Sequence, residues 1–184
     1  MTELEKIIEQ CKKNDRSAQT GLYNWLAPKL LGLCVRYIQD RDEAEDVMQD
    51  AFVKIFTHID SFKNNGSFEG WAKRIAVNTA LTALKKKNKI HFERNIEAAE
   101  SISEVENEPI PFGPEEIMTC MNSLPIGYRT IINLFLVEEF SHKEIAEKLN
   151  ITESTSRSQY SRARQALIKL IKEKTEPMIS KRIQ

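Results

Sequence analysis

The chain has 184 residues, which is room for one domain or two small ones. Its 27 basic and 27 acidic side chains cancel, and this balance taken alone argues against binding to nucleic acid. The charge is segregated, however. Residues 1–90 hold 15 basic and 12 acidic side chains, residues 91–116 hold 1 and 8, and residues 117–184 hold 11 and 7. Two mildly basic blocks therefore flank an acidic segment.

The first half of the chain has the apolar spacing of amphipathic helices. Thr2 and Glu5 are spaced for a capping box at the start of a first helix. A longer helical pattern reaches Tyr37, and Pro28 should kink or divide it. Asp40 opens a third helix with an apolar face that recurs at helical spacing: Ala44, Val47, Met48, Ala51, Phe52, Ile55, Phe56 and Ile59.

The next segment combines aromatic and basic residues. After a turn at 63–66, a helix is predicted from Ser67 to about Lys87, and it ends in a basic tail. From His91 to Pro114 the helical pattern fails, and acidic residues lie among small ones. This composition predicts an acidic, flexible linker.

Ser141 to Arg164 predicts two helices joined by a tight turn. Ser141 and Glu144 are spaced for a capping box. Asn150 tolerates a left-handed backbone at the turn, and Thr152 can cap the second helix. The expected inner face of that helix holds Ser156, Tyr160, Ala163, Leu167 and Leu170. The expected outer face holds Thr155, Arg157, Ser158, Ser161, Arg162 and Gln165.

A small, polar and basic outer face near a helix N-terminus suits entry into the major groove of DNA. The alternative is an ordinary helical hairpin with a solvated basic face. No segment shows sustained period-two alternation, so we predict an all-α protein. Two small helical domains, residues 1–90 and 115–184, are expected on either side of an acidic linker at 91–114.

Three stretches, in this order, resemble the motifs of one family. They are DEAEDVMQDAFVKIF at 42–56, FEGWAKRIAVNTALTALKKK at 68–87 and SLPIGYRTIINLFLVEEFSHKEIAEKLNITESTSRSQYSRARQAL at 123–167. Over nearly its whole length the chain resembles the extracytoplasmic-function (ECF) sigma factors of bacterial RNA polymerase. The resemblance implies a sigma region 2 domain followed by a sigma region 4 domain. It also implies a subunit that binds core RNA polymerase, reads the −10 and −35 elements of promoter DNA and aids DNA melting.

The resemblance assigns the polymerase contact to the helix at 42–56. Asp46, Gln49 and Asp50 match the polar positions of that motif. An acidic face over a buried apolar core suits docking on a basic coiled coil, because opposite charge aids encounter. The alternative is a solvated acidic helix face.

For the −10 element, the resemblance points to the loop and helix from Phe62 to Asn78. Phe62 and Asn78 match positions that line a pocket for a flipped base. The loop at 63–67, with Asn64 and Asn65, would supply backbone contacts. Phosphates would be held by two cations of the helix, Lys73 and Arg74.

For the −35 element, the matching groove-facing positions are Thr155, Arg157, Ser158, Ser161 and Arg162. Two residues depart from the family pattern. Ser156 stands where the family commonly has a β-branched apolar residue, and this weakens the inner packing face. Gln159 stands where the family often has a basic residue, and its amide could instead address adenine.

Other classes of protein fit the sequence less well. A stand-alone helix–turn–helix regulator would use residues 1–90 as a sensor or dimerisation module, but no ligand motif is present. An enzyme is not expected, because GxxxxGK[ST], HExxH and clustered acid–base sets are absent and the three histidines are isolated. We expect no cofactor and no small-molecule substrate.

The cysteines and the apolar runs bear on location. Cys11, Cys34 and Cys120 lie far apart and form no CxxC motif, so neither a disulfide nor a metal site is expected. No signal peptide is recognised, and the longest strongly apolar run, at 131–137, is too short for a bilayer. The expected location is the cytoplasm, without membrane insertion. The resemblance adds an anti-sigma protein as a partner and a linker whose acidic charge mimics RNA in a basic polymerase channel. The alternative for the linker is a merely soluble tether.

Overall fold

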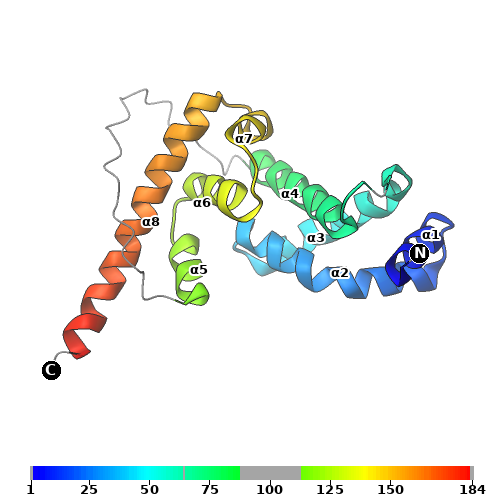
Figure 1. Cartoon of the computed structure of the whole chain (residues 1–184), viewed down its shortest axis with the longest axis horizontal. Coiled ribbons are helices and arrows are strands. Elements are labelled where there is room, and N and C mark those ends of the chain that lie inside the picture. Colours follow the sequence, from blue (N-terminus) through cyan, green and yellow to red (C-terminus); the bar gives the residue numbers. More distant parts are fainter. Residues whose placement is uncertain (1, 64, 88–112, 183–184) are drawn as a thin grey trace. The chain divides into compact units, whose positions relative to one another are not determined.

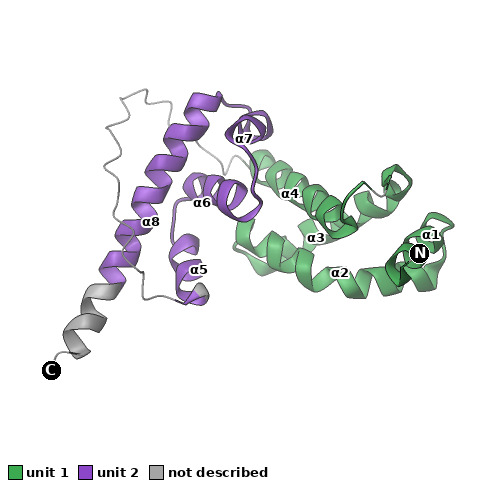
Figure 2. Cartoon of the chain, viewed as in Figure 1, with its two compact units in different colours: residues 1–88 green, residues 89–184 purple. Residues whose placement is uncertain are grey.

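The computed structural model describes residues 2–63, 65–87 and 113–182, without the side chains of Pro114 and of residues 175–182. Within these residues every regular element is a helix, which confirms the predicted all-α class (Figure 1). The chain divides into two compact units, Met1–Asn88 and Lys89–Gln184 (Figure 2). Nearly all of the predicted linker, residues 91–114, lies outside the described residues.

Unit 1 is a helical bundle with an apolar centre. Its elements are α1 (Glu3–Lys12), α2 (Arg16–Tyr37), α3 (Arg41–Thr57), the 3-10 turn η1 (Ile59–Ser61) and α4 (Phe68–Lys86). Helices α2, α3 and α4 pack against one another, and α1 packs on α2 and η1. Burial of apolar side chains holds these helices together, and the least exposed include Leu22, Leu26, Leu30, Leu33, Ala51, Ile55, Ala76, Val77 and Ala80.

The helices of unit 1 begin where local side-chain chemistry predicts. The backbone N–H of Glu5 donates to Thr2 Oγ1 over 3.2 Å, which completes the capping box of α1. Asp40 accepts from the N–H of Glu43 over 2.9 Å at the start of α3. Helix α2 continues through Pro28, so the predicted division does not occur. The lost N–H is outweighed by the leucines that α2 buries before and after that position.

Unit 2 is organised around its longest helix. Its elements are α5 (Pro114–Asn122), α6 (Ile126–Ile132), the π-helical turn η2 (Asn133–Val137), α7 (His142–Leu149) and α8 (Glu153–Arg182). Helix α8 packs against α5, α6 and α7. Helix α6 passes directly into η2, a π-turn that the sequence pattern does not predict.

The helix–turn–helix has the caps that the sequence predicts. Ser141 and Glu144 form the capping box of α7. Asn150 ends α7 in the left-handed region, with φ 56° and ψ 50°. The N–H of Thr155 donates to Thr152 Oγ1 over 3.1 Å at the start of α8. These local interactions fix the reversal between the two helices.

A buried arginine joins the first helix of unit 2 to the second. Arg129 of α6 is 3% exposed, and its Nη1 donates to the carbonyl oxygens of Asn122, over 3.2 Å, and Leu124, over 3.4 Å. Burial lowers the pKa of Arg129. The guanidinium therefore satisfies the carbonyl of Asn122 at the end of α5 and the carbonyl of Leu124 in the turn that follows.

Candidate nucleic-acid and polymerase interfaces

Helix α3 presents a polar face that ends in an apolar side chain. Asp46, Gln49 and Asp50 are exposed and recur at spacings of three and one. Val53 follows at the next position of the same face and is 65% exposed. We call these four residues the α3 face. Val53 is not among the residues predicted from sequence, although its spacing of three from Asp50 places it here.

A hollow of about 420 Å³ opens beside the start of α4. Three of the predicted −10 residues, Phe62, Asn65 and Arg74, line it. Gly66 has φ 101°, a conformation that side chains rarely adopt, and it lets the loop turn around the hollow. The remaining lining residues are Ser61, Lys63, Ser67, Gly70 and Trp71.

Aromatic packing holds one wall of the hollow. The ring of Phe62 lies edge-on to Phe68, with centroids 5.2 Å apart, and 5.6 Å from the ring of Trp71. Phe62 is only 6% exposed, whereas Trp71 is half-buried. The ring of Trp71 packs on that of Phe68 and also lines the hollow.

Lys73 does not line the hollow. Its Nζ lies 2.8 Å from a carboxylate oxygen of Glu69, on the same helix. Glu69 also pairs with Lys29 of α2, so one carboxylate joins two cations and two helices. Hydrogen bonds from Lys29 and then from Lys73 lower the pKa of Glu69. This network reduces the positive charge that Lys73 presents to a phosphate.

Of the two other predicted −10 residues, the structure describes Asn78 alone, and Asn78 is not among the residues that line the hollow. Asn78 is exposed and lies one turn beyond Arg74 on α4, so both side chains share a helix face. Asn64 lies outside the described residues. Arg74 therefore connects the lining of the hollow to the position of Asn78.

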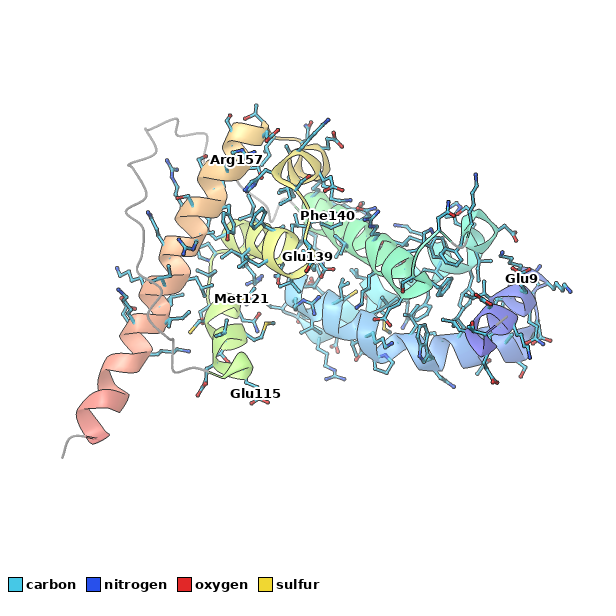
Figure 3. All side chains as sticks on the ribbon, viewed as in Figure 1. Glu9, Glu115, Met121, Glu139, Phe140 and Arg157 are labelled. Carbon is cyan, nitrogen blue, oxygen red and sulfur yellow. The ribbon has the colours of Figure 1, made fainter. Side chains whose placement is uncertain are left out.

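The predicted −35 residues share the first turns of α8. Arg157 is exposed near the start of α8 (Figure 3). Its Nη2 donates to Glu153 Oε1 over 2.6 Å. Ser158 Oγ donates to the carbonyl of Thr155 over 3.0 Å. The half-buried members of this face are Thr155, Ser158, Ser161 and Arg162. The face is small and cationic, as the sequence predicts.

Two neighbours of this face lie inside unit 2. Gln159 is 3% exposed, so the prediction that its amide could address adenine is wrong for this packing. Ser156 is fully buried on the predicted inner face. Its hydroxyl does more than weaken that face, because it lies 2.9 Å from His142 Nδ1 of α7. Sequence spacing places Ser156 inward but does not identify this partner.

The described ranges contain no group of three side chains that could hold a metal ion. Within the same ranges, none of the helices combines the length and the apolar character that a membrane span requires. Cys11, Cys34 and Cys120 are buried free thiols, and burial raises the pKa of Cys34 to about 12. The Cys34 thiol therefore stays protonated at neutral pH and packs as a small apolar side chain.

Comparison with known proteins matches both units to one family. The Sigma-70 region 2 model matches residues 22–90, and the "Sigma-70, region 4" model matches residues 114–167. The chain is 31% identical over 183 residues to the ECF RNA polymerase sigma factor SigW of Bacillus subtilis (strain 168), covering 92% of this chain and 97% of the relative. It is 30% identical over 185 residues to the ECF RNA polymerase sigma-E factor of Escherichia coli (strain K12), covering 94% of each.

Two solved structures share the fold. The sigma factor RpoE of Bartonella quintana, in complex with the anti-sigma factor NepR, matches with a TM-score of 0.52 and 24% identity, covering 83% of this chain and 96% of that one. CnrH, in complex with the cytosolic domain of CnrY, matches with a TM-score of 0.50 and 18% identity, covering 91% of this chain and 96% of that one. At these identities the likeness concerns the fold alone.

Proposed function

Because this chain belongs to the ECF RNA polymerase sigma factors, which direct promoter-specific transcription initiation, we propose that each unit reads one promoter element through the surfaces described above. Unit 1 reads and helps to melt the −10 element, and unit 2 reads the −35 element. The domains proposed for these tasks are residues 1–90 and 115–184, with 91–114 as the connector. The family acts by binding, and we propose no catalytic activity for this chain.

The observation that carries the −10 assignment is the hollow beside α4. Its volume of about 420 Å³ lies in the range of small-ligand sites, and aromatic and cationic side chains line it together. A base taken out of the duplex needs an apolar wall, and its phosphate needs a nearby cation. Phe62 and Trp71 supply the wall, and Arg74 supplies the cation. Lys73, Asn78 and the loop residues Asn64 and Asn65 are proposed to hold the adjoining strand.

The α3 face is the proposed contact with core polymerase. Two carboxylates at Asp46 and Asp50 favour a basic partner, and Gln49 adds hydrogen-bonding capacity. Val53 offers an exposed apolar side chain at the end of the same face. Interfaces commonly place an apolar contact beside polar ones, so this combination supports docking over a merely solvated helix.

The outer face of α8 is the proposed −35 reader. Arg157 and Arg162 are the cations of that face, and an arginine bidentate to guanine adds about 1–3 kcal/mol of discrimination. Thr155, Ser158 and Ser161 are small enough to let the helix approach the bases. In the free protein Arg157 pairs with Glu153, so binding to DNA exchanges one ion pair for another.

The remaining partners are proposed from the family. One structural neighbour was solved with an anti-sigma factor bound, and we propose the same class of partner here. Exposed apolar side chains on both units, Val53, Leu136 and Val137, offer contacts for it. The acidic connector is proposed to pass through a basic polymerase channel. We expect the protein to act in the cytoplasm, where RNA polymerase works.

Reconstitution with core RNA polymerase and genome-wide run-off transcription tests the proposal. The expected result is a set of transcripts that depend on this chain and start downstream of a shared pair of promoter elements. The competing function is a stand-alone helix–turn–helix regulator. It predicts that the free protein forms dimers and binds a palindromic operator tightly without polymerase, and that result would overturn the proposal.

A further inference from the structure

A polar contact crosses the helix–turn–helix from its first helix to its second. His142, the first residue of α7, places Nδ1 2.9 Å from Oγ of Ser156, which lies in the first turn of α8. Ser156 has no exposed surface. A buried hydroxyl depends on a partner inside the protein, because desolvation without a hydrogen bond is costly. His142 is such a partner for Ser156.

Packing fixes the imidazole as well. Its ring stacks on Phe135, with centroids 4.5 Å apart and planes 16° apart. Its edge faces Tyr160, 5.6 Å away, and Phe135 and Tyr160 themselves lie 4.4 Å apart. Phe135 belongs to η2, and Tyr160 lies one turn beyond Ser156 on α8. The ring is therefore held by groups from η2 and α8 while its nitrogen reaches the hydroxyl.

The anchored residue lies between residues that face outward. Thr155 and Arg157 are the immediate neighbours of Ser156 in the chain, and Ser158 follows. Because a helix turns as a rigid unit, fixing the inner side at Ser156 also fixes the direction of these three side chains. Buried, fully partnered polar contacts select one arrangement more strictly than apolar packing alone.

We propose that His142 is a positioning residue for −35 recognition, which acts through its contact with Ser156 to set the rotation of α8 in the groove. This inference rests on the proposed function of α8. It also gives a reason for a serine where the family commonly has a β-branched apolar residue. In this chain a hydrogen bond orients the helix at a place where relatives use apolar contact.

The test compares holoenzymes on one promoter and on a panel of its −35 base-pair substitutions. The measured quantity is the ratio of initiation on the native promoter to initiation on each substituted one. Partial unfolding lowers both rates together and leaves their ratio unchanged, so the ratio reports positioning. His142→Phe keeps a flat ring beside Phe135 but removes Nδ1, and Ser156→Ala removes the hydroxyl. Each is expected to lower the largest ratio about tenfold, the order of one lost buried hydrogen bond.

Two further variants identify the contact as the cause. The double variant His142→Phe/Ser156→Ala is expected to lose no more than the worse single variant, because both changes remove the same hydrogen bond. His142→Asn returns a polar group near the position of Nδ1 and is expected to keep most of the wild-type ratio. His58→Phe makes the same substitution at an exposed histidine of unit 1 and should leave the ratio unchanged.

The possible failures are distinguishable. If the wild-type holoenzyme gives no promoter-specific transcript, the proposed function fails. If it initiates and discriminates −35 sequences while His142→Phe and Ser156→Ala keep the wild-type ratios, only the positioning role is overturned. Multiplying effects, near a hundredfold in the double variant, would also overturn it, because the two residues would then act separately.

Discussion

Glu69→Gln is the substitution that separates a structural role of Lys73 from a role in DNA binding. The carboxylate of Glu69 pairs with Lys29 of α2 and, over 2.8 Å, with Lys73 of α4. Glutamine keeps the shape of the side chain and removes the charge. Both lysines are more than a third exposed, so solvent screens each pair and limits it to about 0.2–1 kcal/mol. We expect the free energy of unfolding to fall by roughly 1 kcal/mol.

Glu69→Gln is expected to strengthen DNA binding, although it weakens folding. Without the carboxylate, Lys73 is released toward the strand that unit 1 is proposed to hold. One additional phosphate contact with single-stranded DNA steepens the slope of log K against log salt by about 0.7. That slope corresponds to an additional loss in affinity of roughly 2.6-fold between 50 and 200 mM salt. The assay is a fluorescence titration of holoenzyme with a −10 fragment that is single-stranded on the non-template side.

Glu9→Gln is the matched control, because Glu9 forms a similar surface pair with Lys12 on α1, also over 2.8 Å. It should change neither the slope nor the affinity. An unchanged slope in Glu69→Gln would refute the assignment of Lys73 to a phosphate. A flatter slope with weaker binding would show that the carboxylate holds the lysine in place for DNA.

Three further outcomes follow from the structure. Asp50→Arg reverses the charge of the α3 face and should abolish co-purification with core polymerase, whereas Asp60→Arg on η1 should not. Glu139 has φ 57°, a left-handed conformation that strains a side chain, so Glu139→Gly should raise the free energy of unfolding by about 1 kcal/mol in a urea titration. Glu138 has φ −96°, where glycine relieves no strain and adds freedom to the unfolded chain, so Glu138→Gly should lower the free energy of unfolding. Burial lowers the pKa of His142, so at mildly acidic pH the folded chain binds fewer protons than the unfolded chain. The free energy of unfolding should therefore fall as pH drops below about 6.5, the ordinary histidine pKa, and level off below the folded pKa. His142→Phe should remove this pH dependence.

Helix boundaries are the part of the fold that could be predicted most closely. Caps depend on residues within about four positions of one another, so Ser141, Glu144 and Asn150 are readable without knowledge of the rest of the chain. The π-turn η2 could not be predicted, because it lies between two helices, α6 and α7, that both pack on α8, a tertiary arrangement that local spacing does not contain. The same limit applies to Pro28, where tertiary burial outweighs a local helix breaker.

In the candidate sites, too, local spacing could be predicted and tertiary contacts could not. Spacing alone puts Asp46, Gln49 and Asp50 on one face, and the structure agrees. Spacing could not reveal that the carboxylate of Glu69, which holds Lys73, also pairs with Lys29, forty residues before Glu69. The outward contact expected of Gln159 rests on the family pattern alone, whereas burial places its side chain inside unit 2. Roles in DNA and polymerase binding stay predictions for every one of these residues.

The buried guanidinium of Arg129 determines how small a working piece of unit 2 can be made. A fragment that starts at α6 would contain the whole helix–turn–helix, yet it would lack both carbonyl acceptors of Arg129, those of Asn122 and Leu124. The cation would then be desolvated without its acceptors, a penalty large enough to unfold a small domain. Fragments for crystallisation or for DNA-binding measurements should therefore begin at or before Gly113, the N-cap of α5.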